Sequence, residues 1–97
     1  MTAVELRPLI SKLFEIAVRH AEALDRLEVG SKEAASVTSS LCKLLNALGK
    51  YHGLLSEEEK DLALMLSKTR RTTKKHHDAV SSAREHLEIA LRELDEI

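Results

Sequence analysis

Mostly apolar residues recur along this chain at alternating steps of four and three residues. This spacing places them on one side of a helix and is typical of helices that pack as a coiled coil. In the first half of the chain the stripe contains Leu6, Ile10, Leu13, Ala17, His20, Leu24, Leu27, Ser31, Ala34, Thr38, Leu41, Leu45 and Leu48. In the second half it contains Leu62, Leu66, Thr69, Thr73, His76, Val80, Ala83, Leu87, Ala90, Leu94 and Ile97. The pattern therefore predicts an all-α protein.

A turn is expected near the middle of the chain. Gly49 and Gly53 flank a short segment, and Ser56 is followed three residues later by Glu59, which is the spacing of a helix-starting capping box. Neither glycine nor proline follows Ser56. The sequence thus predicts a single domain over residues 1–97, with a helix over residues 3–50, a turn over 50–55 and a second helix over 56–97.

The two stripes match in register when the chain folds back at this turn. Leu45 then faces Leu66, and Leu24 faces Leu87. The expected fold is a long antiparallel, coiled-coil-like helical hairpin. Its arms would be about 60–70 Å long, because each helical residue rises 1.5 Å.

Gly30 offers an alternative to this hairpin. The stripe continues in phase through Gly30, which favours one long helix even though glycine costs about 1 kcal/mol relative to alanine inside a helix. The alternative is a break at Gly30, with Ser31 as the N-cap of a separate helix. That break predicts a three-helix bundle, in which more of the apolar surface is buried within the chain.

Apolar residues outside the stripe predict a partner. In an isolated hairpin they would form exposed apolar patches, which mark interaction surfaces. The simplest partner is a second copy of the chain, giving a homodimeric four-helix bundle, and another helical protein is the alternative. The candidate interface residues are Leu9, Phe14, Ile16, Val37, Leu44 and Met65.

Charge is balanced overall but uneven along the chain. The formal net charge is -1, which makes nucleic-acid binding by the whole chain unlikely. Residues 68–77, in contrast, contain basic residues and no acidic residue. A basic helical stripe attracts anionic lipid headgroups, and the alternative is a solvated face that pairs with acids of the other arm. The candidates for contact with anionic lipid are Arg70, Arg71, Lys74 and Lys75.

The sequence contains no pattern typical of a catalytic, metal or cofactor site. His76 and His77 are adjacent and would diverge by about 100° on a helix, whereas a helical metal pair needs a spacing of three or four. His76 is expected in the stripe and His77 in solvent, while the folded-back arms would bring His20 near His86. Cys42 is expected to be buried and inert. We therefore expect no enzyme activity, with a helical phosphocarrier or small enzyme using His76 or His77 as the alternative.

The location expected from the sequence is cytoplasmic, with peripheral attachment to a membrane as an option. The single cysteine fits a reducing compartment. The chain shows no apolar run long enough to span a membrane and no secretory signal pattern at its N-terminus.

Two segments resemble the first two helices of a sorting-nexin-type BAR domain. They are RHAEALDRLEVGSKEAASVTSSLCKLLNALG and LALMLSKTRRTTKKHHDAV. In that family the first helix ends in a Leu-Gly step, here Leu48-Gly49, and the next opens with a Leu-Ser pattern, here Leu66-Ser67. The family's domain has three helices and usually follows a phosphoinositide-binding domain, and we expect neither the third helix nor the preceding domain here. The resemblance implies a dimerising module of membrane trafficking, with the basic residues of 68–77 near lipid.

A second resemblance involves the expected turn. Tyr51-His52-Gly53 is similar to the Trp-x-Gly turn of small type VII secretion substrates, which are hairpins of about this length. This chain has tyrosine in place of the tryptophan. The leading expectation is nevertheless a non-enzymatic protein-interaction or scaffold module that acts through oligomerisation, and a type VII-like substrate is a further alternative.

Overall fold

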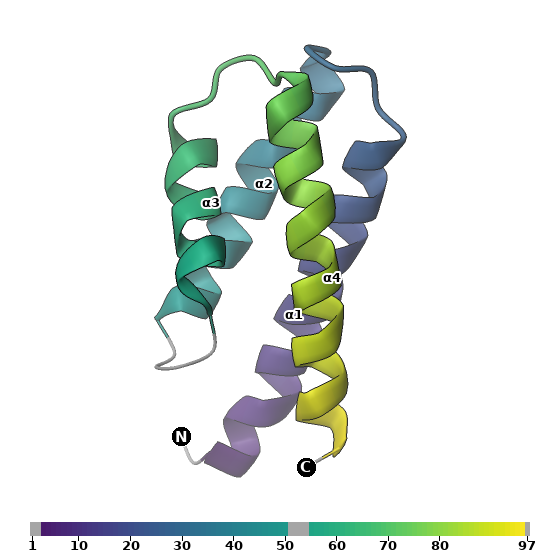
Figure 1. Cartoon of the computed structure of the whole chain (residues 1–97). Helices are drawn as coiled ribbons and strands as arrows, with labels where there is room; N and C mark the ends of the chain where they lie inside the picture. Colours follow the sequence, from purple (N-terminus) through teal and green to yellow (C-terminus); the bar gives the residue numbers. More distant parts are fainter. Residues whose placement is uncertain (1–2, 51–54, 97) are drawn as a thin grey trace.

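The chain folds into a bundle of helices that run alternately up and down (Figure 1). The structure is a computed structural model, and it describes residues 3–50 and 55–96. Within these residues there are four helices: α1 (Ala3–Asp25), α2 (Lys32–Gly49), α3 (Glu57–Ser67) and α4 (Lys74–Glu96). The all-α class predicted from the apolar spacing is confirmed.

The prediction of one unbroken helix over residues 3–50 is wrong, because the chain breaks at Gly30. Gly30 has φ +82°, a left-handed conformation that favours glycine and ends regular right-handed helix. Ser31 then caps α2, since its hydroxyl oxygen accepts a hydrogen bond from the Ala34 N–H at 3.1 Å. The alternative break with Ser31 as N-cap is therefore confirmed.

The second predicted helix is also divided, at residues 68–73, where the sequence contains neither glycine nor proline. Threonine hydroxyls interact with local groups there. Thr69 Oγ1 donates to the Met65 carbonyl at 2.9 Å, and the Thr73 N–H donates to the His76 ring at 3.0 Å. Such local bonds compete with continued helix, which explains the break in physical terms.

The breaks at residues 26–31 and 68–73 lie opposite one another in the two arms of the predicted hairpin. Together they fold the hairpin in half. The longest dimension is 41 Å, well short of the expected arms, and the Cα radius of gyration is 13.2 Å. That radius matches the value of about 13 Å for a compact domain of 100 residues. The bundle is thus formed by the helices of one chain, whereas the sequence predicted that two hairpins would combine.

The helices pair as the predicted fold-back requires. α1 packs against α4, and α2 packs against α3, while α1 also packs on α2. Leu24, Leu87, Leu45 and Leu66, the residues chosen to represent that register, are all buried in the core. The interface between α3 and α4 is the smallest of the four.

The capping box at α3 is confirmed. The Glu59 N–H donates to Ser56 Oγ at 3.3 Å, and the Ser56 N–H donates to Glu59 Oε2 at 3.0 Å. Glu59 is buried because it serves this cap. No helix within residues 3–50 or 55–96 is long and apolar enough to cross a membrane.

Candidate functional site

The loops 26–31 and 68–73 meet at one end of the bundle, at the top of Figure 1. The Gly30 N–H donates to Thr72 Oγ1 at 2.8 Å, which joins the two loops. Thr72 is buried, and its hydroxyl also lies 3.1 Å from His77 Nε2. This contact fixes the position of the basic segment on the bundle.

The position of His77 differs from the prediction. It was expected in solvent, but it is only 8% exposed and hydrogen-bonded to Thr72. The stripe positions Val80, Ala83 and Leu87 of α4 are buried as predicted, and His77, three residues before Val80, lies on the same side of the helix. His77 therefore serves the junction between the two loops.

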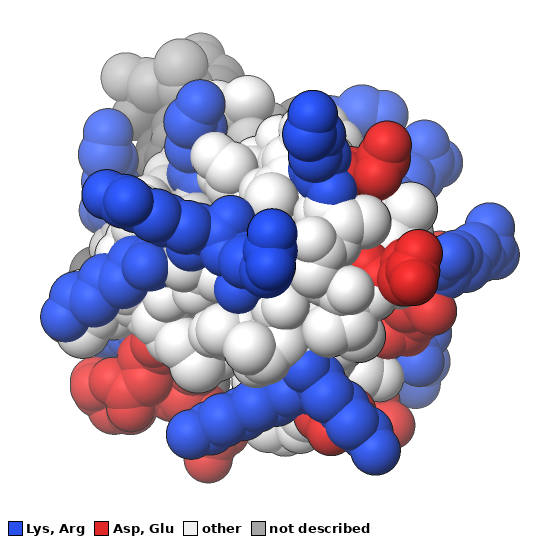
Figure 2. Space-filling view, turned by 90° about the horizontal axis from the view of Figure 1, so that it is seen from above, with Lys and Arg blue, Asp and Glu red and all other residues white. Residues whose placement is uncertain are grey.

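Five basic residues gather at this end, and we call them the basic end: Lys68, Arg70, Arg71, Lys74 and Lys75. All five are exposed, and none forms an ion pair within the described residues. Figure 2 looks down on this end and shows Lys and Arg side chains spread around it, with fewer acidic side chains between them. The four candidates for lipid contact are thus grouped and solvent-facing, and the alternative, in which they pair with acids of the other arm, is not seen in the described part of the chain.

Two of these cations stand at an unfavourable helix end. Lys74 and Lys75 lie in the first turn of α4, which contains no acidic residue. The N-terminus of a helix has positive partial charge, so cations there reduce helix stability by about 0.3–1 kcal/mol each. α3, by comparison, places three glutamates in its first turn. The positive helix end and the lysines therefore reinforce one another at the basic end.

An apolar side chain lies in the neighbouring loop. Val29 is 47% exposed and directly precedes Gly30, whose N–H bonds to Thr72. Because that bond holds the loops together, Val29 belongs to the same end of the bundle as the five cations. The surface combines positive charge with a small apolar contact.

His76 completes a cap at the start of α4. The Thr73 N–H donates to His76 Nδ1 at 3.0 Å, so in the neutral ring the proton is on Nε2. Nε2 then donates to Thr69 Oγ1 at 3.1 Å, and that hydroxyl donates to the Met65 carbonyl. Both ring nitrogens of His76 are thus used in holding the ends of the loop together.

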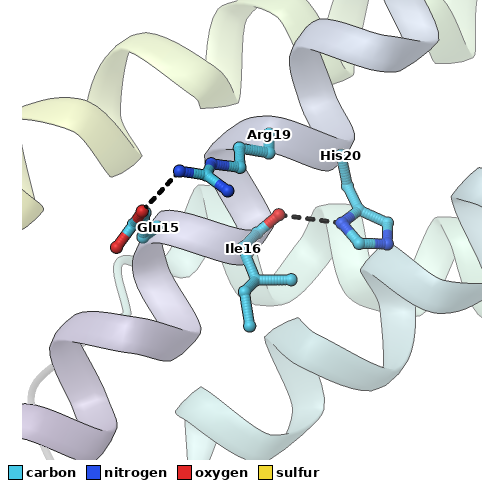
Figure 3. Close-up of polar contacts among 4 residues, drawn as sticks. All are labelled: Glu15, Ile16, Arg19 and His20. Carbon is cyan, nitrogen blue, oxygen red and sulfur yellow. Dashed lines mark hydrogen bonds and ion pairs between the residues drawn. The ribbon is translucent and has the colours of Figure 1, made fainter.

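The expected pairing of His20 with His86 is not formed. His20 Nδ1 donates to the Ile16 carbonyl at 2.8 Å, one turn earlier in α1, as Figure 3 shows beside the Arg19–Glu15 ion pair of 2.7 Å. His86 Nδ1 instead lies 3.5 Å from Glu58 of α3. The two imidazoles therefore serve different elements.

The predicted partner interface is divided by the fold. Phe14 is a correction, since it is 1% exposed and belongs to the chain's own core. Leu9 is 45% exposed and remains available to a partner. Of the other predicted interface residues, Val37, Leu44 and Met65 are half-buried against the core, and Ile16 is half-buried. Folding the hairpin in half accounts for this change, because it buries within one chain the surface that the sequence assigned to two.

A groove lies between α3 and α4, and the sequence did not predict it. The groove has an apolar floor that includes Leu62 and Met65, and acidic residues stand along it. A signal was present in the small residues Ala79, Ser82 and Ala83 of α4, although their spacing alone did not reveal that they face a hollow. 

Other candidate chemistry is limited. Cys42 is buried as expected, and its Sγ donates to the Ala63 carbonyl at 3.4 Å. Residues 3–50 and 55–96 contain no group of three or more His, Cys, Asp or Glu arranged to hold a metal ion. The Tyr51-His52-Gly53 motif lies outside the described residues.

Comparisons with family models, with curated proteins and with solved structures give no match to this chain.

Proposed function

We propose that this protein is a non-enzymatic helical scaffold that attaches to anionic membrane surfaces through its basic end. The observation that carries the proposal is the grouping of five exposed, unpaired cations at one end of the bundle. Cations near an anionic membrane contribute about 1 kcal/mol each. Five such residues are sufficient for reversible attachment without a lipid anchor.

The geometry of the end supports a flat, negatively charged partner. The bond between Gly30 and Thr72 holds both loops in place, so the cations are presented together. Val29 adds an apolar side chain that can enter the headgroup region. Interfacial binding of proteins combines these two contributions, apolar burial and attraction to anionic lipid.

A membrane is favoured over nucleic acid. Single-stranded nucleic acid is usually bound by aromatic stacking, and the chain has only Phe14 and Tyr51, of which Phe14 is in the core. The phosphates of a nucleic-acid duplex could bind the cations, but they offer no apolar contact for the exposed Val29. The resemblance to sorting-nexin-type BAR helices supports the same choice and suggests membrane trafficking as the setting.

Scaffolding also requires contact with other proteins. In this proposal the chain assembles with itself or with another helical protein through apolar side chains that its own fold leaves accessible, Leu9 first among them. Light scattering coupled to size-exclusion chromatography tests this part directly, because a dimer doubles the mass.

Vesicle co-sedimentation tests the membrane attachment. We expect wild-type protein to bind phosphatidylcholine vesicles containing phosphatidylserine and to ignore pure phosphatidylcholine. Binding should weaken as salt rises from about 50 to about 300 mM, because exposed charges are screened over about 10 Å at 0.1 M. Reversal of four cations of the basic end to glutamate should abolish binding: Arg70→Glu, Arg71→Glu, Lys74→Glu and Lys75→Glu.

A matched variant separates this site from net charge. It reverses four exposed cations elsewhere and so has the same net charge: Lys12→Glu, Lys43→Glu, Lys50→Glu and Arg92→Glu. We expect it to keep most of the binding. Equal loss in both variants, or no wild-type binding at low salt, would overturn the proposal, and tighter binding to duplex DNA than to vesicles would reassign the basic end to nucleic acid.

A further inference from the structure

The groove between α3 and α4 is a second surface, separate from the basic end. It consists of two adjoining hollows of about 360 and 390 Å³, which share Glu58, Glu59 and His86 in their walls. One hollow reaches Met65 and Ala79, and the other reaches Leu55 and Glu93. The hollows therefore follow the junction of the two helices along their length.

The groove is open because α4 presents small side chains to α3. Ala79, Ser82 and Ala83 lie across from Leu62 and Met65, so the two helices touch less than any other packed pair in the described bundle. Leu62 and Ala83 form a buried floor, while Met65 is half-buried. An apolar floor without a covering side chain is a surface that gains from contact with a partner.

The apolar edge continues toward the C-terminal part of α4. Ile89 is 50% exposed and lines the hollow beside Leu55 and Ala90. A large aliphatic side chain that is half in solvent at the mouth of a hollow favours a partner that covers it. The groove is thus mainly apolar at the Met65 end and mixes apolar with polar side chains at the Leu55 end.

The charge of the walls is negative. Glu58, Asp61 and Glu93 line the groove and are exposed, and Glu59 is held by the capping box of α3. Neither lysine nor arginine lines either hollow. His86, which lies 3.5 Å from Glu58, is the one basic side chain of the lining. A partner with cations beside an apolar stripe would complement this arrangement.

We propose that the groove binds an amphipathic α-helix from a partner protein, with an apolar stripe flanked by Lys and Arg. The distance along α4 from Ala79 to Glu93 is about 21 Å at 1.5 Å per residue, which matches about four turns of helix. Helices commonly dock in this way, with apolar anchors at i, i+3 or i+4, and i+7. The apolar anchors would cover Leu62, Met65 and Ile89, and the cations would face Glu58, Asp61 and Glu93.

The groove does not suit a twofold dimer of this chain. In a twofold dimer through this surface the same patch is used on both subunits, so the acidic walls of the two copies would face one another. Like charges placed together disfavour such a contact. The charge of the walls therefore selects a different, cationic helix.

Fluorescence polarisation with a synthetic peptide tests the proposal. The probe is a labelled helical peptide of about 15 residues, with leucine at i, i+4, i+7 and i+11 and lysine on both sides of the stripe. The matched peptide has glutamate in place of every lysine. We expect the lysine peptide to bind wild-type protein at least about tenfold more tightly than the glutamate peptide, a difference of about 1.4 kcal/mol.

Protein variants then locate the binding. Ser82→Leu fills the hollow without changing charge, and the pair Asp61→Lys and Glu93→Lys reverses the walls. Each should weaken the lysine peptide by about tenfold or more. Glu85→Lys, on the same helix but outside the groove lining, should leave the affinity within about twofold of wild type.

Several results would overturn the proposal. These are equal affinity for the two peptides, no binding of the lysine peptide, or unchanged affinity in the Ser82→Leu variant. A dimer of wild-type protein that Ser82→Leu dissociates would assign the groove to a second copy instead. Because the basic end takes no part and the substitution leaves the net charge unchanged, vesicle binding by Ser82→Leu should remain as in wild type.

Discussion

The backbone N–H of Gly30 donates to the hydroxyl oxygen of Thr72 at 2.8 Å, across 42 positions of sequence. Thr72 is 2% exposed, and the same hydroxyl contacts His77 Nε2. One buried side chain therefore connects the loop between α1 and α2 to the loop between α3 and α4. The two halves of the bundle are held together at the end that presents the cations.

Thr72→Val is expected to lower the free energy of unfolding by about 2 kcal/mol, because it leaves a partly buried N–H and a buried imidazole nitrogen without their partner. Urea unfolding followed by circular dichroism measures this change. Ser39→Ala, at an exposed position of α2, is the control and should change stability by less than about 0.5 kcal/mol. Equal stabilities of Thr72→Val and wild type would show that the bond between the loops contributes nothing.

Two glycines provide a matched test of backbone conformation. Gly30→Ala is expected to cost about 1 kcal/mol of stability, because alanine resists the positive φ of +82° even though its Cβ would meet only ordinary contacts, the nearest at 3.5 Å from Arg71 Cγ. Gly49→Ala is expected to be neutral or stabilising by about 0.5–1 kcal/mol, because Gly49 is helical. Thermal unfolding measures both effects. The midpoint temperature should fall for Gly30→Ala and should stay the same or rise for Gly49→Ala. A larger loss at Gly49 would contradict this account.

Phe14→Ala is expected to destabilise the single chain by about 3–5 kcal/mol, since it empties a core position that is 1% exposed. Leu9→Ala, on the same helix but 45% exposed, should cost less than about 1 kcal/mol. Chemical unfolding gives both values, and sedimentation velocity reports whether the mass changes. If Phe14→Ala instead dissociated an oligomer and left each chain folded, Phe14 would belong to an interface between chains.

Cys42 is expected to react slowly with thiol reagents in the native protein. Its side chain is 7% exposed and lies between α2 and α3, where Sγ donates to the Ala63 carbonyl. Labelling should accelerate with urea as these helices separate, because the reaction then follows local opening or unfolding. Ellman's reagent measures the rate, and complete reaction of native protein within the mixing time would contradict the buried position.

The sequence predicted helices and their pairing well, because these depend on repeated local signals. The spacing of Leu24, Leu45, Leu66 and Leu87 predicted which helices pack together, and Ser56 with Glu59 predicted the start of α3. The break at Gly30 was predicted only as an alternative, because the apolar spacing continues in phase across it. A short loop can preserve that phase by chance.

Features that depend on tertiary contacts were not predicted. Nothing in the sequence around Thr72 shows that its hydroxyl meets Gly30, so the break at 68–73 and the burial of His77 followed only from the fold. The groove between α3 and α4 also depends on tertiary contacts. Small residues such as Ala83 occur in tightly packed helices too, and their effect depends on how far α3 stands from α4. Of the candidate site, the basic residues were predicted, and their common placement at one end was not.

The pairing of α1 with α4 also has a consequence for folding during translation. α1 leaves the ribosome first among the described helices, yet its largest interface is with α4, which leaves last. A nascent chain that has released only α1, α2 and α3 therefore exposes the side of α1 that α4 later covers. Exposed apolar surface in such incomplete chains promotes aggregation, so the time between synthesis of α1 and synthesis of α4 is when this chain is most prone to aggregate.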